Sequence, residues 1–358
     1  MPKTIMSELD AEKRRRCFDE VAFGYDEEAA VEEANRCIEC GKCVKGCPVG
    51  IDIPGFIKKI KEGDYREACR ILKTDNMLPA VCGRVCPQEK QCEAECVIGL
   101  NDEPVAIGAL ERFAAEHDDS KPVKKDSAGF HVAVVGSGPA GLTCAANLAL
   151  LGHEVVVFEA LHEAGGVLRY GIPSFRLPDS IIDSEIRSIK KLGVEIECNR
   201  VAGLSPPVHE LEQDFDAVFI GSGAGLPYFL GLPGENLNGV YSANEFLIRV
   251  NLMHAGQFPE YDTPVSLGKN VVVIGGGNVA FDCARSALRL GADNVTIVYR
   301  RGMEELPARR QEIDHAVEEG VEFKLLTNPV SFRGEDGWVH GLECVSMELG
   351  EEDSSGRR

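Results

Sequence analysis

Two segments of the chain repeat one pattern: a short β-branched run, a glycine-rich turn, a helical stretch and a second β-branched run. The first is HVAVVGSGPAGLTCAANLALLGHEVVVFEA, residues 131–160, and the second is NVVVIGGGNVAFDCARSALRLGADNVTIVYRR, residues 270–301. Parallel strands need a crossover of a dozen or more residues, usually a helix, and both segments provide one. The sequence therefore predicts an α/β fold with two separate Rossmann-like units.

The first turn has the pattern G-x-G-x-x-G directly after a strand. Its candidate cofactor contacts are Gly136, Gly138, Pro139, Ala140 and Gly141. Such glycines permit a tight turn, a close approach of the backbone to a pyrophosphate, and close packing of helix on strand. The pyrophosphate then lies at a helix N-terminus, where free N–H groups favour an anion. Glu159 ends the second strand, where an acid accepts a hydrogen bond from a ribose 2′-OH. This context favours a dinucleotide site over an ordinary glycine turn.

The second turn carries an allowed variant of the pattern, with Ala280 in the third glycine position. Its candidate contacts are Gly275, Gly277, Asn278 and Val279. Arg300 and Arg301 stand where the first unit has its acid, and arginine pairs with a 2′-phosphate that a carboxylate would repel. A solvated strand end is the alternative explanation for these arginines. The two units together predict FAD at the first site and NADP(H) at the second.

A run of four cysteines precedes both units. Cys37, Cys40, Cys43 and Cys47 lie in RCIECGKCVKGCP, residues 36–48. The spacing matches the bacterial ferredoxin run, in which three thiolates hold one cubane and the fourth ligates another cluster. Structural zinc usually takes two cysteine pairs separated by a longer spacer, and disulfide scaffolds are short secreted chains. The pattern favours iron–sulfur ligation over zinc or disulfides.

A second cysteine group, Cys82, Cys86, Cys92 and Cys96, follows further along the chain. Two cubanes need eight ligands, and the two groups together contain eight cysteines, with Cys69 between them. The count alone would assign all eight, but the spacing does not show which cysteines share a cluster. Thiolates bound to metal in a reducing cytoplasm explain this usage better than a disulfide framework does.

Composition narrows the possible partners. The formal net charge is −20, which disfavours nucleic-acid binding, since that requires basic surface to neutralise phosphates. A solvated acidic surface explains the charge, and a docking surface for a basic partner is the alternative. No apolar run is long enough to predict a membrane span, and the N-terminus lacks the apolar segment of a secretory signal.

The changes in composition along the chain predict five segments. Residues 1–35 form a helical lead-in, and residues 36–117 a helical domain with two [4Fe–4S] clusters. Residues 118–129 form a polar linker. Residues 130–245 form the FAD-binding domain and residues 246–358 the NADP(H)-binding domain.

Four stretches in the same order resemble a known family. They are LPAVCGRVCPQEKQCEAEC, VAIGALERFAAE, VAVVGSGPAGL and GGVLRYGIPSFRLP. They resemble the small (beta) subunit of NADPH-dependent glutamate synthase, and the resemblance covers residues 30–358. The wider family includes the large subunit of the electron-bifurcating NADH-dependent ferredoxin:NADP oxidoreductase and the N-terminal half of dihydropyrimidine dehydrogenase. Family members continue beyond the last motif, so the resemblance implies that both nucleotide domains are incomplete here.

The resemblance implies a partition of the metal ligands. One cluster would take Cys37, Cys40, Cys43 and Cys96. The other would take Cys47, Cys86, Cys92 and, on the next helix, Glu111. Cys82 would then be a buried residue that binds no metal. A non-cysteine ligand changes the charge of a cluster and hence its reduction potential.

The resemblance also implies further flavin contacts. They are Gly166, Leu168, Gly171, Ile172 and, in FIGSGAGLP, Gly223. The residues alone indicate only sharp turns or close backbone approach at these positions.

The implied function is that of an electron-input subunit, an NAD(P)H-dependent flavin and iron–sulfur oxidoreductase. Electrons would pass between NADP(H), FAD, two [4Fe–4S] clusters and a protein partner, and no catalytic acid, base or nucleophile is expected. The partner would resemble the glutamate synthase large subunit, or a ferredoxin or flavoprotein of a bifurcating complex, in a cytoplasmic hetero-oligomer. Two alternatives are a subunit of a bifurcating, hydrogenase or formate dehydrogenase complex, and a non-catalytic electron wire without flavin.

Overall fold

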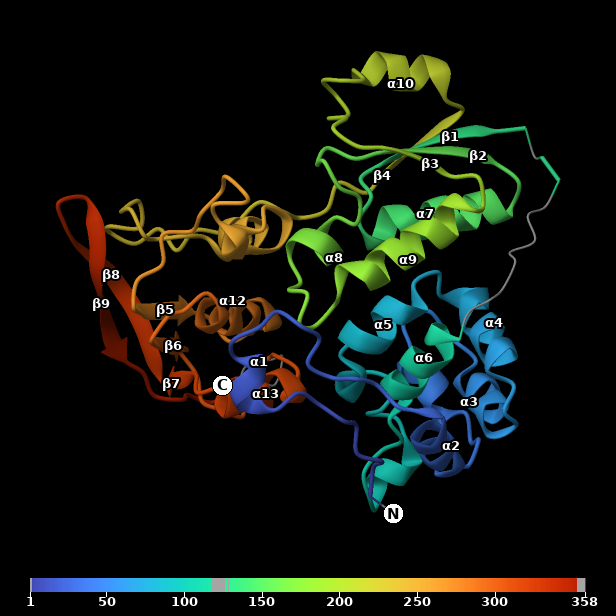
Figure 1. Ribbon diagram of the computed structural model, residues 1–358, viewed down its shortest axis with the longest axis horizontal. Helices are drawn as coiled ribbons and strands as arrows, with labels where there is room; N and C mark the ends of the chain where they lie inside the picture. The colour runs from blue at the N-terminus through green and yellow to red at the C-terminus, as the bar shows by residue number, and fades with distance from the viewer. Residues whose placement is uncertain (1, 118–125, 128, 353–357) are drawn as a thin grey trace. The chain divides into compact units, whose positions relative to one another are not determined.

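The computed structural model describes residues 2–117, 126–127, 129–352 and 358 (Figure 1). Contacts divide the chain into two compact units. The first contains Met1–Glu8, Glu20–Arg169 and Arg176–Gly223, and the second contains Leu9–Asp19, Tyr170–Phe175 and Ala224–Arg358. Most of the expected linker lies outside the described residues. Among the described helices, none has both the length and the apolar character needed to span a bilayer.

The first part of unit one is helical. Its helices are α2 (Glu27–Asn35), α3 (Ile53–Lys61), α4 (Tyr65–Asp75), α5 (Pro79–Val85) and α6 (Ile107–Glu116), with short 3-10 helices η1 (Lys42–Gly46), η2 (Gln88–Lys90) and η3 (Val97–Leu100). Aspartates start three of them: the side chains of Asp26, Asp52 and Asp64 accept hydrogen bonds from backbone N–H groups of the first turn. Helix α6 is almost entirely buried and packs against α2, α3, α4 and α5, so it forms the centre of this domain.

The second part of unit one is a four-stranded parallel sheet. Its strands are β1 (His131–Val135), β2 (Glu154–Phe158), β3 (Glu195–Glu197) and β4 (Ala217–Ile220), in the order β3-β2-β1-β4. Its helices are α7 (Pro139–Leu150), α8 (Val167–Tyr170), α9 (Asp179–Lys190) and α10 (Val208–Asp214). Helices α7 and α9 cover one face and α10 the other (Figure 1). Val135 is in register with Phe158, so Gly136 and Glu159 follow directly at one sheet edge.

Unit two contains a three-stranded parallel sheet and a separate hairpin. The sheet strands are β5 (Asn270–Ile274), β6 (Asn294–Val298) and β7 (Glu322–Lys324), in that order, and the hairpin strands are β8 (Thr327–Glu335) and β9 (Trp338–Ser346). The helices are α1 (Ala11–Arg14), α11 (Ala243–Leu247), α12 (Asn278–Arg289) and α13 (Arg310–Glu318), with one-turn segments η4 (Ile248–Leu252) and η5 (Ala255–Gln257). The mixed α/β class with parallel sheets and an N-terminal helical domain is as the sequence predicts.

A buried carboxylate holds the distant segments of unit two together. Glu319 is fully buried and accepts hydrogen bonds from Arg285, Arg289 and Arg14 at distances of 2.7–3.1 Å. Burial alone would raise the pKa of Glu319, but these hydrogen bonds and the charges of Arg289 and Arg285 lower it to about 2. Because the pKa is lowered, the carboxylate stabilises the fold above its ordinary value of 4.5, and this contribution is lost as the pH falls toward 2.

Phe175 joins the same cluster from the 170–175 segment. The guanidinium carbons of Arg285 and Arg289 lie 4.6 and 3.9 Å from the centroid of its buried ring. The ring of Phe18 lies 6.1 Å from that of Phe175, and the hydroxyl of Ser174 donates to the Phe18 carbonyl at 2.9 Å. These contacts explain why residues 9–19 and 170–175, which are remote in sequence, belong to the second unit.

We predict that Glu319→Gln lowers the stability of unit two by about 3–5 kcal/mol, since it removes the buried negative charge that three buried guanidinium groups share. The neighbouring Glu318→Gln is the matched control. Glu318 also pairs with Arg14, but its side chain is 56% exposed, so the loss should stay below about 1 kcal/mol. Thermal unfolding followed by circular dichroism would compare the two variants, and equal losses would contradict the prediction.

Candidate functional site

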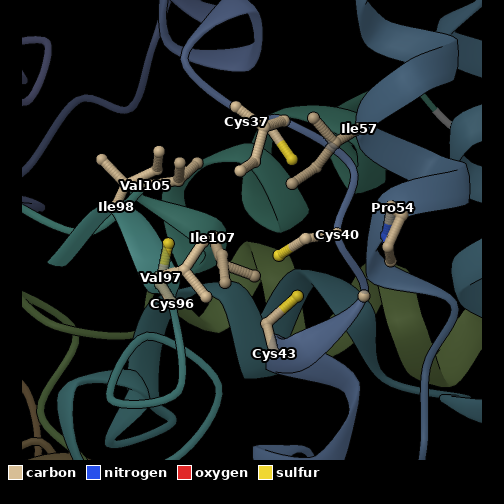
Figure 2. A pocket seen from close by; sticks show the side chains of 12 residues that line it. Cys37, Cys40, Cys43, Pro54, Ile57, Cys96, Val97, Ile98, Val105 and Ile107 are labelled. Atoms are coloured by element: carbon tan, nitrogen blue, oxygen red, sulfur yellow. The ribbon is translucent and has the colours of Figure 1, made fainter. Parts of the chain in front are cut away.

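The four ligands assigned to the first cluster line one cavity. Cys37 and Cys40 come from the turn after α2, Cys43 from η1, and Cys96 from the turn before η3, and their side chains point toward a shared space (Figure 2). The rest of the lining is mainly apolar: Ile38, Gly41, Pro54, Ile57, Val97, Ile98, Val105 and Ile107. Four thiols around a hydrophobic cavity are the donor set of a [4Fe–4S] cluster, so the residues present fit this group.

The backbone of the cysteine run bends sharply to present its thiols. Glu39 and Gly41 have φ values of 58° and 73°, the left-handed region that turns a chain back on itself. The N–H of Glu39 donates to the sulfur of Cys37 at 3.4 Å. The ammonium of Lys61 donates to the carbonyl of Cys37 at 2.7 Å and pairs with Glu39 at 2.8 Å, which ties the run to helix α3.

The thiols of this group are close enough to affect one another. Burial, and to a smaller extent the charges of the neighbouring Cys37, Cys96 and Cys40, raise the pKa of the Cys43 thiol to about 11. Four thiolates therefore repel one another unless a cation neutralises them. Among the described residues, no three His, Cys, Asp or Glu side chains are grouped closely enough to hold a single metal ion.

Cys47, the fourth cysteine of the run, lies on the side of the second group. A Cβ at Gly46 would lie 2.4 Å from the carbonyl oxygen of Gln91 and 3.0 Å from the Cα of Cys92, so only glycine permits this approach. Burial raises the pKa of Cys92, and the charges of Glu93, Glu111 and Cys47 contribute to that shift. The close approach at Gly46 therefore brings the cysteine run against Gln91 and Cys92, as a run that supplies ligands to two clusters requires.

Glu111 is buried on helix α6 beside Cys86. Burial raises the pKa of its carboxyl to about 8, and the nearby Cys86 contributes to the shift. Its Oε1 accepts a hydrogen bond from the Nδ2 of Asn76 at 2.8 Å. In the part of the chain that the structure describes, no lysine or arginine forms an ion pair with Glu111. A buried carboxylate without a cation partner is a suitable donor to a metal.

Cys82 lies beside Cys86 and Glu111. A hydrogen bond with Cys86 and burial both raise the pKa of its thiol, with the charges of Cys86 and Glu111 adding to the effect. Its sulfur lies 3.7 Å from the Oδ1 of Asn76. The structure therefore brings Cys47, Cys86, Cys92 and Glu111 together with Cys82 as a neighbour, and which of them bind metal stays a prediction.

The first glycine turn requires its glycines for steric reasons. A Cβ at Gly136, which has a φ of 96°, would lie 2.4 Å from the carbonyl oxygen of Gly221. A Cβ at Gly141 would lie 1.9 Å from the carbonyl oxygen of Gly136. A Cβ at Gly138, the N-cap of α7, would meet open space at the start of a helix that begins with Pro139 and Ala140. Free backbone N–H groups in such a space fit a pyrophosphate.

The carboxylate of Glu159 stabilises this turn by hydrogen bonds. Its Oε2 accepts hydrogen bonds from the N–H, at 2.9 Å, and the hydroxyl of Ser137, and its Oε1 accepts from the N–H of Leu161 at 2.9 Å. The Ser137 hydroxyl in turn accepts from the N–H of Gly165 at 2.9 Å. Sequence reasoning missed this role, because Ser137 occupies a variable position of the motif. The expected contact with a ribose stays a prediction.

Some of the other expected flavin contacts lie beside the turn. A Cβ at Gly166 would lie 2.6 Å from the Cα of Gly138, and the adjacent Leu168 is buried. Gly223 follows β4 with a φ of 73°. Gly171 and Ile172 belong to the 170–175 segment of unit two. Their contact with a flavin therefore stays a prediction.

The second glycine turn leads into α12. Gly275 has a φ of 132°, Gly277 is the N-cap, and the side chain of Asn278 accepts a hydrogen bond from the N–H of Arg309 at 2.9 Å. A Cβ at Gly276 would lie 2.7 Å from Leu306. A side chain at this variable position would therefore have to displace Leu306 and the ring of Tyr299, which the motif did not reveal.

Two arginines follow β6 at the same edge of the sheet. Arg300 is exposed and Arg301 is half-buried, while Val279 is exposed on the first turn of α12. Within the described ranges neither arginine has a carboxylate partner. Cationic side chains that are accessible and unpaired beside a helix N-terminus fit the 2′-phosphate of NADP(H).

Comparison with known proteins defines the class. Residues 13–123 match the family model of dihydropyrimidine dehydrogenase domain II, 4Fe–4S cluster, and residues 130–355 match that of the pyridine nucleotide-disulphide oxidoreductases. The chain belongs to the pyridine nucleotide-disulphide oxidoreductase family and carries a 4Fe–4S domain before it. Iron–sulfur, FAD and NADP(H) are thereby confirmed as its cofactors, whereas the number of clusters stays a prediction.

Particular relatives narrow the class. The chain is 41% identical over 344 residues to the NADP(+)-dependent formate dehydrogenase subunit beta of Moorella thermoacetica, covering 88% of this chain and 47% of that protein. It is 40% identical over 353 residues to the glutamate synthase [NADPH] small chain of Escherichia coli, covering 95% of this chain and 74% of that protein. The chain thus spans about half of one relative and three quarters of the other, and the resemblance to the glutamate synthase small subunit is confirmed.

A solved structure supports the fold. FprA of Mycobacterium tuberculosis in complex with NADPH matches with a TM-score of 0.53 and 25% sequence identity, covering 64% of this chain and 66% of that one. The expected class, a flavin- and iron–sulfur-dependent NAD(P)H oxidoreductase, is confirmed by the family matches and this likeness.

We predict that Cys40→Ala halves the iron bound by the purified chain, because one of two clusters loses a ligand. Cys69→Ala is the control, since Cys69 is fully buried on α4 and belongs to neither ligand set. It should keep all the iron. Anaerobic purification followed by iron counting and electron paramagnetic resonance (EPR) would measure both variants. Full iron in Cys40→Ala, or equal loss in both variants, would contradict the assignment.

Proposed function

We propose that the chain is the electron-input subunit of a larger oxidoreductase, in which electrons pass between NADP(H), FAD, two [4Fe–4S] clusters and a protein partner. Bound FAD supplies the step between two-electron hydride chemistry and one-electron transfer. The observation that carries this proposal is the composition of unit one, which contains both the flavin turn and the two cysteine groups. One compact unit can hold a flavin and its electron acceptors at fixed separations.

A contact between α5 and α9 supports the proposal that unit one holds both the flavin and the clusters. The carboxylate of Glu185 on α9 accepts a hydrogen bond from the N–H of Ala80, at the start of α5, at 2.9 Å. Helix α5 ends at Cys86, an expected ligand of the second cluster, and α9 packs against α7, which begins at the flavin turn. Helices α5, α9 and α7 therefore connect the residues that would hold the second cluster with those that would hold the flavin.

The chain's own residues position the cofactors. The backbone N–H groups at the start of α7 would hold the FAD pyrophosphate, those at the start of α12 the NADP(H) pyrophosphate, and Arg300 and Arg301 the 2′-phosphate. Gly171, Ile172 and Gly223 would contact the flavin. No side chain is assigned as an acid, base or nucleophile, since positioning and tuning of the cofactors is the work left to the protein.

Cys40, an expected ligand of the first cluster, is exposed, whereas the thiols expected to bind the second cluster are half-buried at Cys47 and Cys86 and buried at Cys92. We place the exchange of electrons with the partner at this exposed end. A protein partner is supported by the relatives, which are themselves named as subunits or chains of larger enzymes. A hetero-oligomer in the reducing cytoplasm, where the thiolates remain available to iron, suits this role.

A glutamate synthase small subunit is the first candidate, and a subunit of a formate dehydrogenase or bifurcating complex is the second. The second is favoured by the 41% identity to the Moorella thermoacetica subunit. Copurification with the partner, then addition of glutamine with 2-oxoglutarate or of formate, would separate them. A sample that forms glutamate supports the first, and one that reduces NADP(+) with formate supports the second.

Reduction of the chain by NADPH tests the core of the proposal. The anaerobically purified chain should show flavin absorbance that bleaches on addition of NADPH, together with EPR signals of reduced clusters. Clusters without any bound flavin would instead support a non-catalytic electron wire. Absence of both flavin and clusters would overturn the proposal altogether.

We predict that Arg300→Ala combined with Arg301→Ala raises the KM for NADPH at least tenfold, since each charged hydrogen bond to a phosphate contributes about 1.5–3 kcal/mol. The KM for NADH, which lacks the phosphate, should change less than about threefold. Arg333→Ala, at an exposed ion pair on the hairpin, is the control and should change neither value. Steady-state reduction of an artificial acceptor measures all of them. Parallel changes for both nucleotides would exclude phosphate recognition by these arginines.

A further inference from the structure

Asn76 connects the two residues that compete for one position in the second cluster site. It is buried at the end of α4, where it is the C-cap. Its Nδ2 donates to the Oε1 of Glu111 at 2.8 Å, and its Oδ1 lies 3.7 Å from the sulfur of Cys82. One amide therefore contacts both Glu111 and Cys82, each of which is a neighbour of Cys86.

The orientation of this amide is set by the backbone. The N–H of Leu78 donates to the Oδ1 of Asn76 at 3.0 Å, and only the oxygen of the amide can accept this hydrogen bond. The Nδ2 must therefore face Glu111. With Oε1 held by Asn76, the other oxygen of Glu111 remains for a metal, whereas the sulfur of Cys82 is held as a donor to Oδ1.

We propose that Asn76 is a positioning residue that makes Glu111, and not Cys82, the fourth ligand of the second cluster. This inference rests on the proposed cluster sites. Cys47, Cys86 and Cys92 would supply three thiolates. Two side chains beside Cys86 could take the fourth position: the carboxylate of Glu111 on α6 and the thiol of Cys82 on α5. The hydrogen-bond partner of a metal ligand sets the orientation of that ligand. A change from a carboxylate to a thiolate ligand changes the charge of the cluster and hence its reduction potential.

A purely structural role accounts for only part of the geometry. The hydrogen bond from Leu78 N–H to Asn76 is a local turn at the end of a helix, which asparagine commonly forms. The bond to Glu111 joins residues 35 positions apart on different helices and contributes nothing to that turn. The substitution that tests the proposal should therefore preserve the first contact and remove the second.

Asn76→Asp meets this requirement, because an aspartate oxygen still accepts from Leu78 while the donor to Glu111 is replaced by an acceptor. We expect Asn76→Asp to retain the iron of the parent chain but to change the EPR spectrum of one cluster, as Cys82 replaces Glu111. Asn35→Asp, which adds the same charge at the exposed end of α2, is the control and should leave the spectrum unchanged.

Combination with Cys82→Ala identifies the replacing ligand. Cys82→Ala alone should retain both clusters with the parent spectrum, whereas Asn76→Asp with Cys82→Ala should lose half of the iron. The signal of the first cluster, which neither substitution touches, reports that the protein is folded. If the double variant is unfolded, Cys82→Ala still decides: a lost or altered cluster in that single variant would overturn the proposal.

The remaining outcomes also have definite meanings. A double variant that keeps all its iron, or an unchanged spectrum in Asn76→Asp, would refute the role of Asn76 while leaving the two clusters intact. A parent chain with iron for only one cluster would refute the proposed cluster sites, and this inference with them. Iron content and the EPR spectrum thus separate the two failures without a measurement of activity.

Discussion

The close packing of helix α5 against helix α6 is the contact on which the iron–sulfur domain depends. A Cβ at Gly83 would lie 2.5 Å from the backbone nitrogen of Arg112, so the two helices touch along their backbones and only glycine allows it. This approach places Cys86, which follows α5, beside Glu111 on α6. It also buries the guanidinium groups of Arg84 and Arg112, both of which pair with Glu116 at the surface. A wider spacing would separate Cys86 from Glu111, the carboxylate that we propose as the fourth donor of the second cluster.

Two buried glutamates show how its surroundings decide whether a buried carboxylate stabilises the fold or is available to bind a metal. Glu319 lies among three arginines, and the pKa of its carboxyl is lowered to about 2. Glu111 is also buried, but among the described residues its carboxylate accepts a side-chain hydrogen bond only from the amide of Asn76, and its pKa is raised to about 8. A buried carboxylate is stable when its charge is paired, so the first holds segments together. The second remains short of positive charge, which a metal cluster would supply.

Much of the architecture could be predicted from the sequence, because local patterns determine it. The strand, glycine turn and helix recur at both nucleotide sites, and the spacing of the cysteine run indicates how many thiols face one centre. The roles of Asn76, Ser137 and Gly276 could not be predicted. Each depends on a partner from another segment. Ser137 and Gly276 occupy variable positions of the glycine motifs, and Asn76 lies outside the motifs. The predicted segments placed residues 9–19 in the helical lead-in and residues 170–175 in the FAD-binding domain, whereas contacts group both with the second unit. These contacts include the hydrogen bond from Arg14 to Glu319 and the packing of Arg289 on Phe175, which join residues far apart in the sequence.

The sequence by itself determined the class of fold and the kinds of cofactor. The steric freedom of glycine, the metal affinity of cysteine and the charge of arginine belong to the residue itself and do not depend on its neighbours in space. Only the tertiary structure showed that Cys37, Cys40 and Cys43 share a cavity with the distant Cys96, and that Gly46 brings the run against the second cysteine group. The physical reason is that a cluster site forms only where donor side chains from separate segments come together. Its donors come from segments whose separation in space is set by helix packing, and spacing along the chain carries no record of that packing.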